Sequence, residues 1–312
     1  DVFLSRRLKR LSRARAQEII RSGGLSRADG PPLNKPSHRV FEGETVLLRR
    51  RKLNEEPPED IRLPVVYEDA DLIAINKPGD VVVHPTASAY HRTVIRIARA
   101  RLNEPELDLA HRIDKETSGL VIMSRNPAAA THLSLQFARR TVEKSYLAVV
   151  LGAPEWDERT IELPLRLVPD SLTKCLMEVG GAGAQPALTH VRVVARGDRT
   201  ALVEARPKTG RQHQIRLHLA HIGHPILGDK LYFGSEDFFV AAIRGDYDEA
   251  ALVGSVGHPR QALHAWQASF QHPEDGRTFT QAAPLPEDMV ALARRMRIPV
   301  PEALCEATPP PG

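Results

Sequence analysis

The residues Leu120, Val121, Ile122 and Met123 form an uninterrupted apolar run that follows a polar turn. A strand with an apolar side chain at every position has no solvent face, so the run predicts a strand buried on both sides. Thr117, Ser118 and Gly119, directly before it, are typical turn residues. The sequence therefore predicts a polar turn at the edge of a buried strand.

Asp114 lies in this turn, two residues after Arg112. A carboxylate at the edge of a core can be partly desolvated, and its neighbours can tune its chemistry. The alternative is a solvated acid that caps its own turn. The pattern alone does not choose between these two interpretations.

Positive charge is concentrated in the first part of the chain. Residues 1–52 hold 14 Lys and Arg against 5 Asp and Glu, a net charge of +9, whereas the whole chain of 312 residues carries +4. A basic segment on a mildly acidic body favours a polyanionic partner. We favour binding of nucleic acid over the alternative, a basic surface that is merely solvated.

The basic segment also has a helical pattern. Leu4, Leu8 and Leu11 repeat at helical spacing in residues 3–11, and residues 13–22 predict a second helix that ends before two glycines. A turn at residues 39–45 leads into a short strand near Val46. The arginines that crowd the two helices are the candidate RNA contacts: Arg6, Arg10, Arg13 and Arg15.

Residues 53–64 contain three prolines and four acids, which indicates an exposed linker. The two cysteines, Cys175 and Cys305, lie far apart without a metal-binding spacing, so a reducing cytoplasm is expected. No apolar run approaches the roughly 18 residues that span a bilayer. We expect no membrane association.

The rest of the chain alternates strands and helices. Strands are expected at 65–69, 72–75, 143–151, 159–163, 185–195 and 201–206, and helices at 93–102, 128–139 and from 284 onwards. Thr209 is a candidate N-cap and Gly223 a candidate C-cap of a further helix. Lys77, in an Asn-Lys-Pro-Gly turn, is either a phosphate contact or an exposed turn lysine.

His218, His221 and His224 invite a zinc interpretation. Three residues apart on a helix they fan around its axis, and no acid completes a known ligand set, so we expect no metal.

Three strings resemble motifs of the RluA family of RNA pseudouridine synthases. HRIDKETSGLVIMSRN resembles the family's central motif, EKSYLAVVLG its second, and TGRQHQIRLHLAHIGHP its third. The resemblance implies that Asp114 is the catalytic residue, that Tyr146 lies against the target uracil, and that Arg211 pairs with Asp114. Arg112 would hold a phosphate or occupy the space that the flipped base leaves. Residues 12–46 resemble the RNA-binding domain of ribosomal protein S-four. Residues 234–259 are longer than the connection usual in the RluA family, so the resemblance implies an insertion there.

The resemblance implies an α+β fold, with a mixed, mostly antiparallel sheet, flanking helices and a central cleft. We expect a small N-terminal α/β RNA-binding domain at 1–52, a linker at 53–64, the catalytic domain at 65–300 and a tail at 301–312. The implied reaction isomerises uridine to pseudouridine without a cofactor, in large-subunit ribosomal RNA, by a monomer. Whether Asp114 attacks the sugar or removes a proton stays open.

Three other functions remain as alternatives. The first is the same reaction on transfer RNA, and the second a non-catalytic RNA-binding or chaperone role, which would be marked by loss of Asp114. The third is glycoside hydrolysis, which requires two carboxylates and would need Glu116 as the partner of Asp114.

Overall fold

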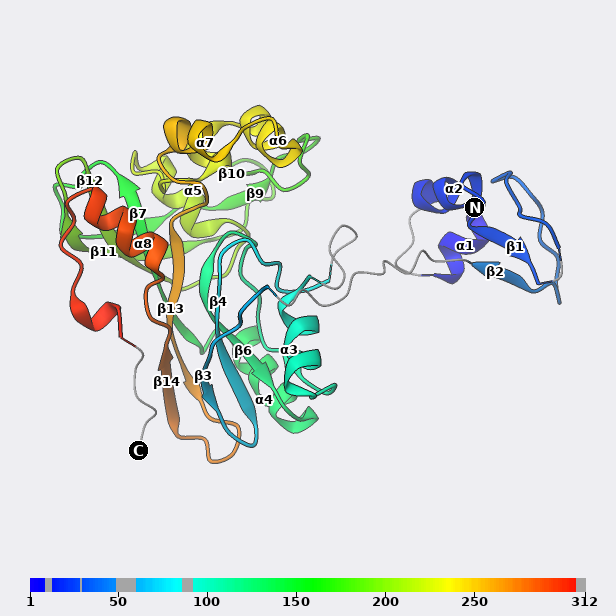
Figure 1. The fold of residues 1–312 in the computed structure, drawn as a ribbon, viewed down its shortest axis with the longest axis horizontal. Coiled ribbons are helices and arrows are strands. Elements are labelled where there is room, and N and C mark those ends of the chain that lie inside the picture. The colour runs from blue at the N-terminus through cyan, green and yellow to red at the C-terminus, as the bar shows by residue number, and fades with distance from the viewer. Residues whose placement is uncertain (9–12, 29, 49–59, 86–91, 307–312) are drawn as a thin grey trace. The chain divides into compact units, whose positions relative to one another are not determined.

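The computed structural model describes residues 1–8, 13–28, 30–48, 60–85 and 92–306. Within it the chain forms two compact units, Asp1–Asn54 and Glu55–Gly312 (Figure 1). Each unit has its own apolar core.

The N-terminal unit packs two helices against a two-stranded antiparallel sheet. Its elements are α1 (Val2–Arg7), α2 (Arg13–Arg21), β1 (Leu25–Arg27) and β2 (Val46–Leu48). Leu4, Ala16, Ile20, Leu25 and Leu33 form its buried core. The two predicted helices are present. Part of the first predicted helix, residues 9–11, lies outside the described residues.

One mixed sheet organises the C-terminal unit, Glu55–Gly312. Its strands follow the order β3-β4-β6-β13-β7-β12-β11-β8, with β14 beside β13 and β5 beside β6. The bounds are β3 (Val65–Glu68), β4 (Leu72–Lys77), β5 (Asp108–Leu109), β6 (Ser118–Ser124), β7 (Glu143–Leu151), β8 (Glu158–Glu162), β11 (Leu188–Arg196), β12 (Thr200–Pro207), β13 (Leu263–Gln271) and β14 (Thr278–Ala282). A separate pair consists of β9 (Leu165–Leu167) and β10 (Met177–Val179). Only β6 and β13 pair in parallel among the described strands, so the predicted mostly antiparallel sheet is confirmed.

Strand β6 is buried along its whole length, as its apolar run predicted. Leu120 and Ile122 belong to one core cluster and Val121 and Met123 to another, which is the alternation of a strand covered on both faces. Gly119, at its start, has φ 109°, and a Cβ there would meet the carbonyl oxygen of Ala265 at 2.2 Å. The glycine lets β13 approach β6 closely, so the turn before β6 lies beside the start of β13.

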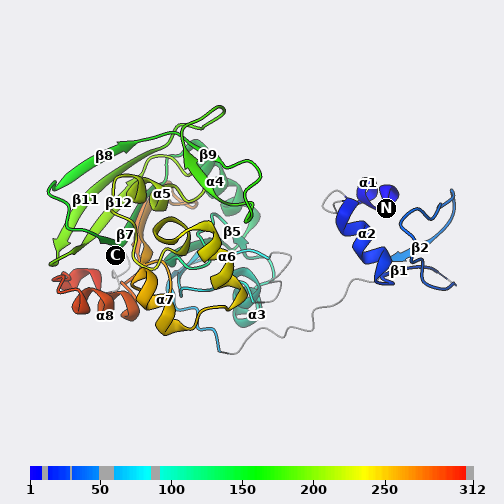
Figure 2. The same ribbon diagram turned by 90° about the horizontal axis from the view of Figure 1, so that it is seen from above.

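Helices cover both faces of the sheet (Figures 1 and 2). Apolar residues of α3 pack on the Val121 side of β6, whereas α4 packs on the Leu120 side. The helices are α3 (Val94–Leu102), α4 (Pro127–Arg139), α5 (Gln214–His221), α6 (Glu236–Arg244), α7 (Glu249–Val256) and α8 (Glu287–Arg295), with a π-helical turn η1 (Lys230–Gly234) and a 3-10 turn η2 (Glu302–Leu304).

Two expected boundary segments pack against the C-terminal unit. Ile61 and Leu63, at the end of the expected linker, contact the cluster around α3. In the expected tail, Leu304 is buried in the main core, and its carbonyl accepts the Leu285 N–H at 2.8 Å. Residues 49–59 and 307–312 lie outside the described residues. The 234–259 insertion forms α6 and α7.

Candidate active site

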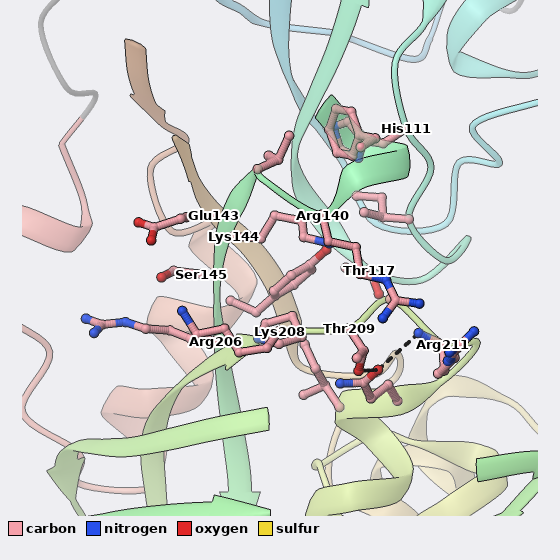
Figure 3. A pocket seen from close by; sticks show the side chains of 18 of the residues that line it. His111, Thr117, Arg140, Glu143, Lys144, Ser145, Arg206, Lys208, Thr209 and Arg211 are labelled. Atoms are coloured by element: carbon pink, nitrogen blue, oxygen red, sulfur yellow. Dashed lines mark hydrogen bonds between the residues drawn. The ribbon is translucent and has the colours of Figure 1, made fainter. Parts of the chain in front are cut away.

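A cleft of about 1070 Å³ opens where the turn before β6, the strands β7, β12 and β13, and the start of α5 meet (Figure 3). Its charged lining residues are Arg112, Arg140, Lys144, Arg206, Lys208, Arg211 and Arg216 against Asp114 and Glu143. Seven cations against two acids make the cleft attractive to a polyanion. Asp114, Arg112, Tyr146 and Arg211, which the sequence singled out, all line this one cleft.

The turn that carries Asp114 is fixed from several directions. Gln261 donates from Nε2 to the Thr117 hydroxyl at 2.6 Å and from its backbone N–H to Oε2 of Glu116 at 3.0 Å. Arg260 donates to the Glu116 carbonyl and to the Ser118 hydroxyl. These bonds join the turn to the segment just before β13 and hold Asp114 in a defined place.

Lys77 is one of these supports and not a phosphate contact. Its side chain is fully buried at the end of β4, and Nζ donates to the carbonyls of Pro78, Val81 and Lys115 at 2.7–2.9 Å. Burial, with the nearby charge of Arg260, lowers the pKa of Lys77 to about 7. Neither phosphate contact nor exposed turn lysine describes this residue, because the backbone closes around its ammonium group.

Arg216, in the first turn of α5, provides the ion pair to Asp114. Its Nη1 lies 3.0 Å from Oδ2 of Asp114. Its Nε and Nη2 form a two-pronged pair with Asp229 at 2.7 and 2.9 Å. The Arg216 side chain is 7% exposed and that of Asp229 0%. One guanidinium therefore joins a fully buried carboxylate to one that faces the cleft.

Electrostatics favour the charged forms of Arg216 and Asp229. Burial raises the pKa of Asp229, but Arg216 and the backbone N–H groups of Tyr232 and Leu231 lower it by a larger amount, so the net shift is downward. Burial disfavours the charge on Arg216, yet Asp229 and then Asp114 raise its pKa. Among the described residues no hydrogen bond reaches Oδ1 of Asp114, so this oxygen is available for chemistry.

The predicted pairing of Arg211 with Asp114 is wrong. The side-chain Nε of Arg211 donates to the Pro186 carbonyl at 3.2 Å. The prediction placed Arg211 in a helix that began after Thr209, but α5 begins at Gln214, behind His213 with φ 53°. Arg211 therefore lies in the turn before the helix, at one end of the cleft (Figure 3).

The side chain of Gln214 explains the late start of α5. Its Oε1 accepts the Thr209 hydroxyl at 2.7 Å and the Arg211 N–H at 3.0 Å, while Nε2 donates to the Leu188 carbonyl. Gln214 thus closes residues 209–213 into a loop tied to β11. Thr209 is not the N-cap, because its hydroxyl is used in this loop.

Tyr146 and Arg112 reach the cleft from different elements. Tyr146 lies on β7, between Ala205 of β12 and Ala265 of β13. Burial, and then the charge of Asp114, raise the pKa of Tyr146, so the ring stays neutral. Arg112 is exposed in the same loop as Asp114. Beside the Asp114 carboxylate, the flat neutral ring of Tyr146 can therefore hold a base, and the long cationic side chain of Arg112 can hold a phosphate.

Among the described residues, one group of three potential metal ligands lies together: Asp71, His272 and Glu274, with ligand atoms within 4.8 Å. Both ring nitrogens of His272 are already engaged. Nε2 lies 2.7 Å from Oδ2 of Asp69, and Nδ1 accepts the Glu274 N–H at 3.3 Å. His218 contacts the Thr189 hydroxyl and the Leu163 carbonyl. His224 contacts the Leu151 carbonyl.

Comparison with known proteins decides the family. Residues 71–221 match the family described as RNA pseudouridylate synthase. The ribosomal large subunit pseudouridine synthase D of Neisseria meningitidis serogroup A is 35% identical over 305 residues, covering 96% of this chain and 78% of that protein. That of Zymomonas mobilis is 32% identical and covers 96% and 93%. The chain belongs to the RNA pseudouridylate synthase family.

Solved structures agree with this assignment. The human RNA pseudouridylate synthase domain containing 1 is 26% identical, with a TM-score of 0.57 over 83% of this chain and 100% of that chain. The human domain containing 4, 24% identical with a TM-score of 0.59 over 76% and 94%, shares the fold. The chain is thus an RNA pseudouridine synthase with the predicted α+β fold.

The sequence alone did not single out two members of this synthase's charged triad, Arg216 and Asp229. A signal was present: Arg216 lies within the third motif, five residues after Arg211, and Asp229 lies four residues beyond the end of that motif, directly after Gly228. Two arginines in one motif left the choice of partner to tertiary structure. Both oxygens of Glu116 accept bonds, from Lys230 Nζ and from the Gln261 N–H, so Glu116 is engaged in support rather than free as a second catalytic acid.

Proposed function

We propose that this synthase isomerises uridine in large-subunit ribosomal RNA, with Asp114 as its catalytic carboxylate. The observation that carries the proposal is the Asp114–Arg216 ion pair of 3.0 Å inside a cleft lined mainly by cations. The relatives' names, ribosomal large subunit pseudouridine synthase D, support ribosomal RNA over transfer RNA as the substrate.

The chemistry assigns a separate task to each residue. The target uridine must leave its helix to enter the cleft, where Tyr146 gives its base a flat surface. Arg112 holds an adjacent phosphate. Asp114, paired with Arg216 at 3.0 Å, acts while the bond from the ribose carbon to uracil N1 breaks and a bond from that carbon to uracil C5 forms. The proton on C5 is then lost and N1, released from the ribose, takes up a proton, so the product is an isomer of the substrate.

We further propose that the N-terminal unit is an S-four-like RNA-binding domain that anchors the substrate. The two helices and the net charge of +9 on residues 1–52 support this role. Arg6 is exposed on α1, and Arg13 of α2 is 65% exposed while its Nε contacts Asp1 at 2.8 Å. Arg10 and the side chain of Arg15 lie outside the described residues. None of the described helices is long and apolar enough to cross a membrane. A monomer in the cytoplasm is the form we propose.

Release of tritium from transcripts that contain 5-tritiated uridine tests the catalytic assignment. Asp114→Asn should reduce single-turnover release to background, because it removes the carboxylate and keeps the side-chain shape. The matched control is Asp157→Asn, whose carboxylate is 86% exposed and pairs with Arg196 at the surface. The control should retain the wild-type rate. Turnover by Asp114→Asn above a trace would remove Asp114 from the catalytic role.

The same assay tests the substrate. Ribosomal and transfer RNA transcripts are compared as substrates, and pseudouridines are mapped in cells with and without the gene. Loss of modification confined to transfer RNA would contradict the ribosomal assignment.

A further inference from the structure

A buried carboxylate outside the catalytic triad holds two surface arginines together. Glu204 on β12 is 1% exposed, and it accepts bonds from three side chains. Arg206 donates from Nε and Nη2 at 2.7 and 3.0 Å, Arg192 from Nη2 at 2.8 Å, and the Ser145 hydroxyl at 2.9 Å. The catalytic steps proposed above use none of these groups.

The register of the sheet explains this cluster. Arg192 of β11 lies directly opposite Glu204, and Arg206 follows Glu204 by two residues on β12, so all three share one face. Their neighbour Thr189 points to the other face, where it contacts Gln214 and His218 of α5. The cluster therefore lies on the sheet face away from α5.

Charge and exposure suit the cluster to bind an anion. Burial raises the pKa of Glu204, but hydrogen bonds from Arg206 and Arg192 lower it by a larger amount, so the carboxylate stays ionised. The two arginine side chains are 55% and 46% exposed. Among the described residues neither Nη1 has a hydrogen-bond partner. Two oriented guanidiniums thus present unused donors to solvent at little further entropic cost.

The cluster continues the active-site cleft. Arg206 and Ser145 line the cleft as well as contacting Glu204. In Figure 3 the guanidinium of Arg206 extends away from the end of the cleft that holds Thr209 and Arg211. Glu158, opposite Arg192 on β8, and Glu143 at the start of β7 border the cluster with negative charge. These acids border the cationic surface that the two arginines form.

We propose that the RNA strand next to the target uridine leaves the cleft over this sheet face, with its phosphates on Arg206 and Arg192. Glu204 is a positioning residue in this site, since it orients both arginines without reaching the RNA. The proposal rests on the proposed function for its ligand, because a cleft that accepts a uridine in RNA must also accept the flanking backbone. Phosphates bound in this way fix the register of the strand and carry no sequence information.

The test is the triple variant Arg192→Gln, Glu204→Gln, Arg206→Gln. Substituting all three avoids leaving a buried carboxylate without its cations, which would threaten the fold. Affinity is measured with an in vitro transcript of large-subunit ribosomal RNA at several salt concentrations. The dissociation constant should rise about tenfold or more, and the slope of its logarithm against that of salt should fall by about 1 to 2. The single-turnover rate at saturating RNA should stay near the wild-type value.

The charge-matched control is Arg159→Gln. Like the triple variant, it lowers the net charge by one. Arg159 lies on β8 next to Thr160, and its side chain points to the sheet face opposite the one that carries Glu204 and the two arginines. The control should bind the transcript within about twofold of wild type. Equal affinity of the triple variant and the control would overturn the proposal. Binding by Asp114→Asn, measured in parallel, separates this outcome from failure of the catalytic assignment.

Discussion

Arg216 is the residue on which the geometry of the catalytic carboxylate depends. It pairs through two nitrogens with Asp229, which is inaccessible to solvent, and through the third with Asp114, which faces the cleft. The inner pair fixes the guanidinium plane, so Nη1 has one direction left in which to donate. Asp114 is therefore positioned by a group that is itself immobilised.

Arg216→Met should destabilise the fold by about 3–5 kcal/mol, because it leaves Asp229 buried without a cation. Without Arg216, burial raises the pKa of Asp229 above its unfolded value, so the loss should be largest at neutral pH and shrink as pH falls. Denaturant unfolding at several pH values measures the loss of stability and its pH dependence, and single-turnover rates measure the loss of activity. Arg211→Met is the control, since Arg211 gives up one bond to a carbonyl at the surface. Equal stability losses for the two variants would contradict this account.

The turn from Asp114 to Ser118 is an element fixed from outside itself. Lys77 from β4 binds the Lys115 carbonyl, Arg260 binds the Glu116 carbonyl, and His264 of β13 contacts the Ser118 hydroxyl at 3.0 Å. Because these donors and acceptors come from both strands beside β6, the turn keeps its shape only when the sheet is assembled.

His264 makes this element sensitive to acid. It is fully buried, and burial lowers its pKa to about 4. Nε2 must donate to the Ala283 carbonyl at 3.0 Å, so Nδ1 of the neutral ring accepts the Ser118 hydroxyl. Below about pH 6.5 the His264 imidazole binds a proton in the unfolded chain, whereas in the folded protein it stays neutral until the pH is lower. The stability contributed by the neutral ring is therefore present above pH 6.5 and is lost as pH falls toward 4.

His264→Gln should flatten this pH dependence. Between pH 6.5 and 5 the wild type should lose up to about 2 kcal/mol more unfolding free energy than the variant. Chemical denaturation at each pH measures the difference, and the baseline stability of the variant at pH 8 serves as its own reference. Parallel curves for both proteins would show that His264 does not titrate in this way.

At the scale of the whole molecule, the two compact units divide charge and catalysis. Residues 1–52 carry a net +9, while the catalytic unit holds the cleft and its own cores. Deleting residues 1–52 should weaken binding of ribosomal RNA and reduce its salt dependence, because fewer counterions are released. The catalytic unit should remain folded, as its apolar clusters lie within its own residues.

Circular dichroism and thermal unfolding check the fold of the truncated protein, and affinity at several salt concentrations checks its binding. An unchanged affinity and salt slope would show that the N-terminal unit does not anchor RNA. A truncated protein that fails to fold would contradict the independence of the two units.

Local patterns determined much of this protein. The apolar run of β6 predicted burial on both faces, because alternation along a strand leaves no other arrangement. The helices α2, α3 and α4 followed from their spacing, and the motif around Asp114 indicated the family. Such features depend on residues close together in the chain, which a sequence displays directly.

Tertiary structure alone decided which side chains meet. Asp114 and Arg216 are 102 residues apart, and the third motif offered two arginines for one carboxylate. The choice followed from where α5 begins, and that was set by Gln214 binding residues of β11 and of the preceding loop. The sequence likewise predicted Lys77 to be a phosphate contact or an exposed turn lysine, because its three carbonyl partners gather around it only in the folded chain. Hydrogen bonds and ion pairs between distant segments depend on the folded geometry, and local spacing does not encode it.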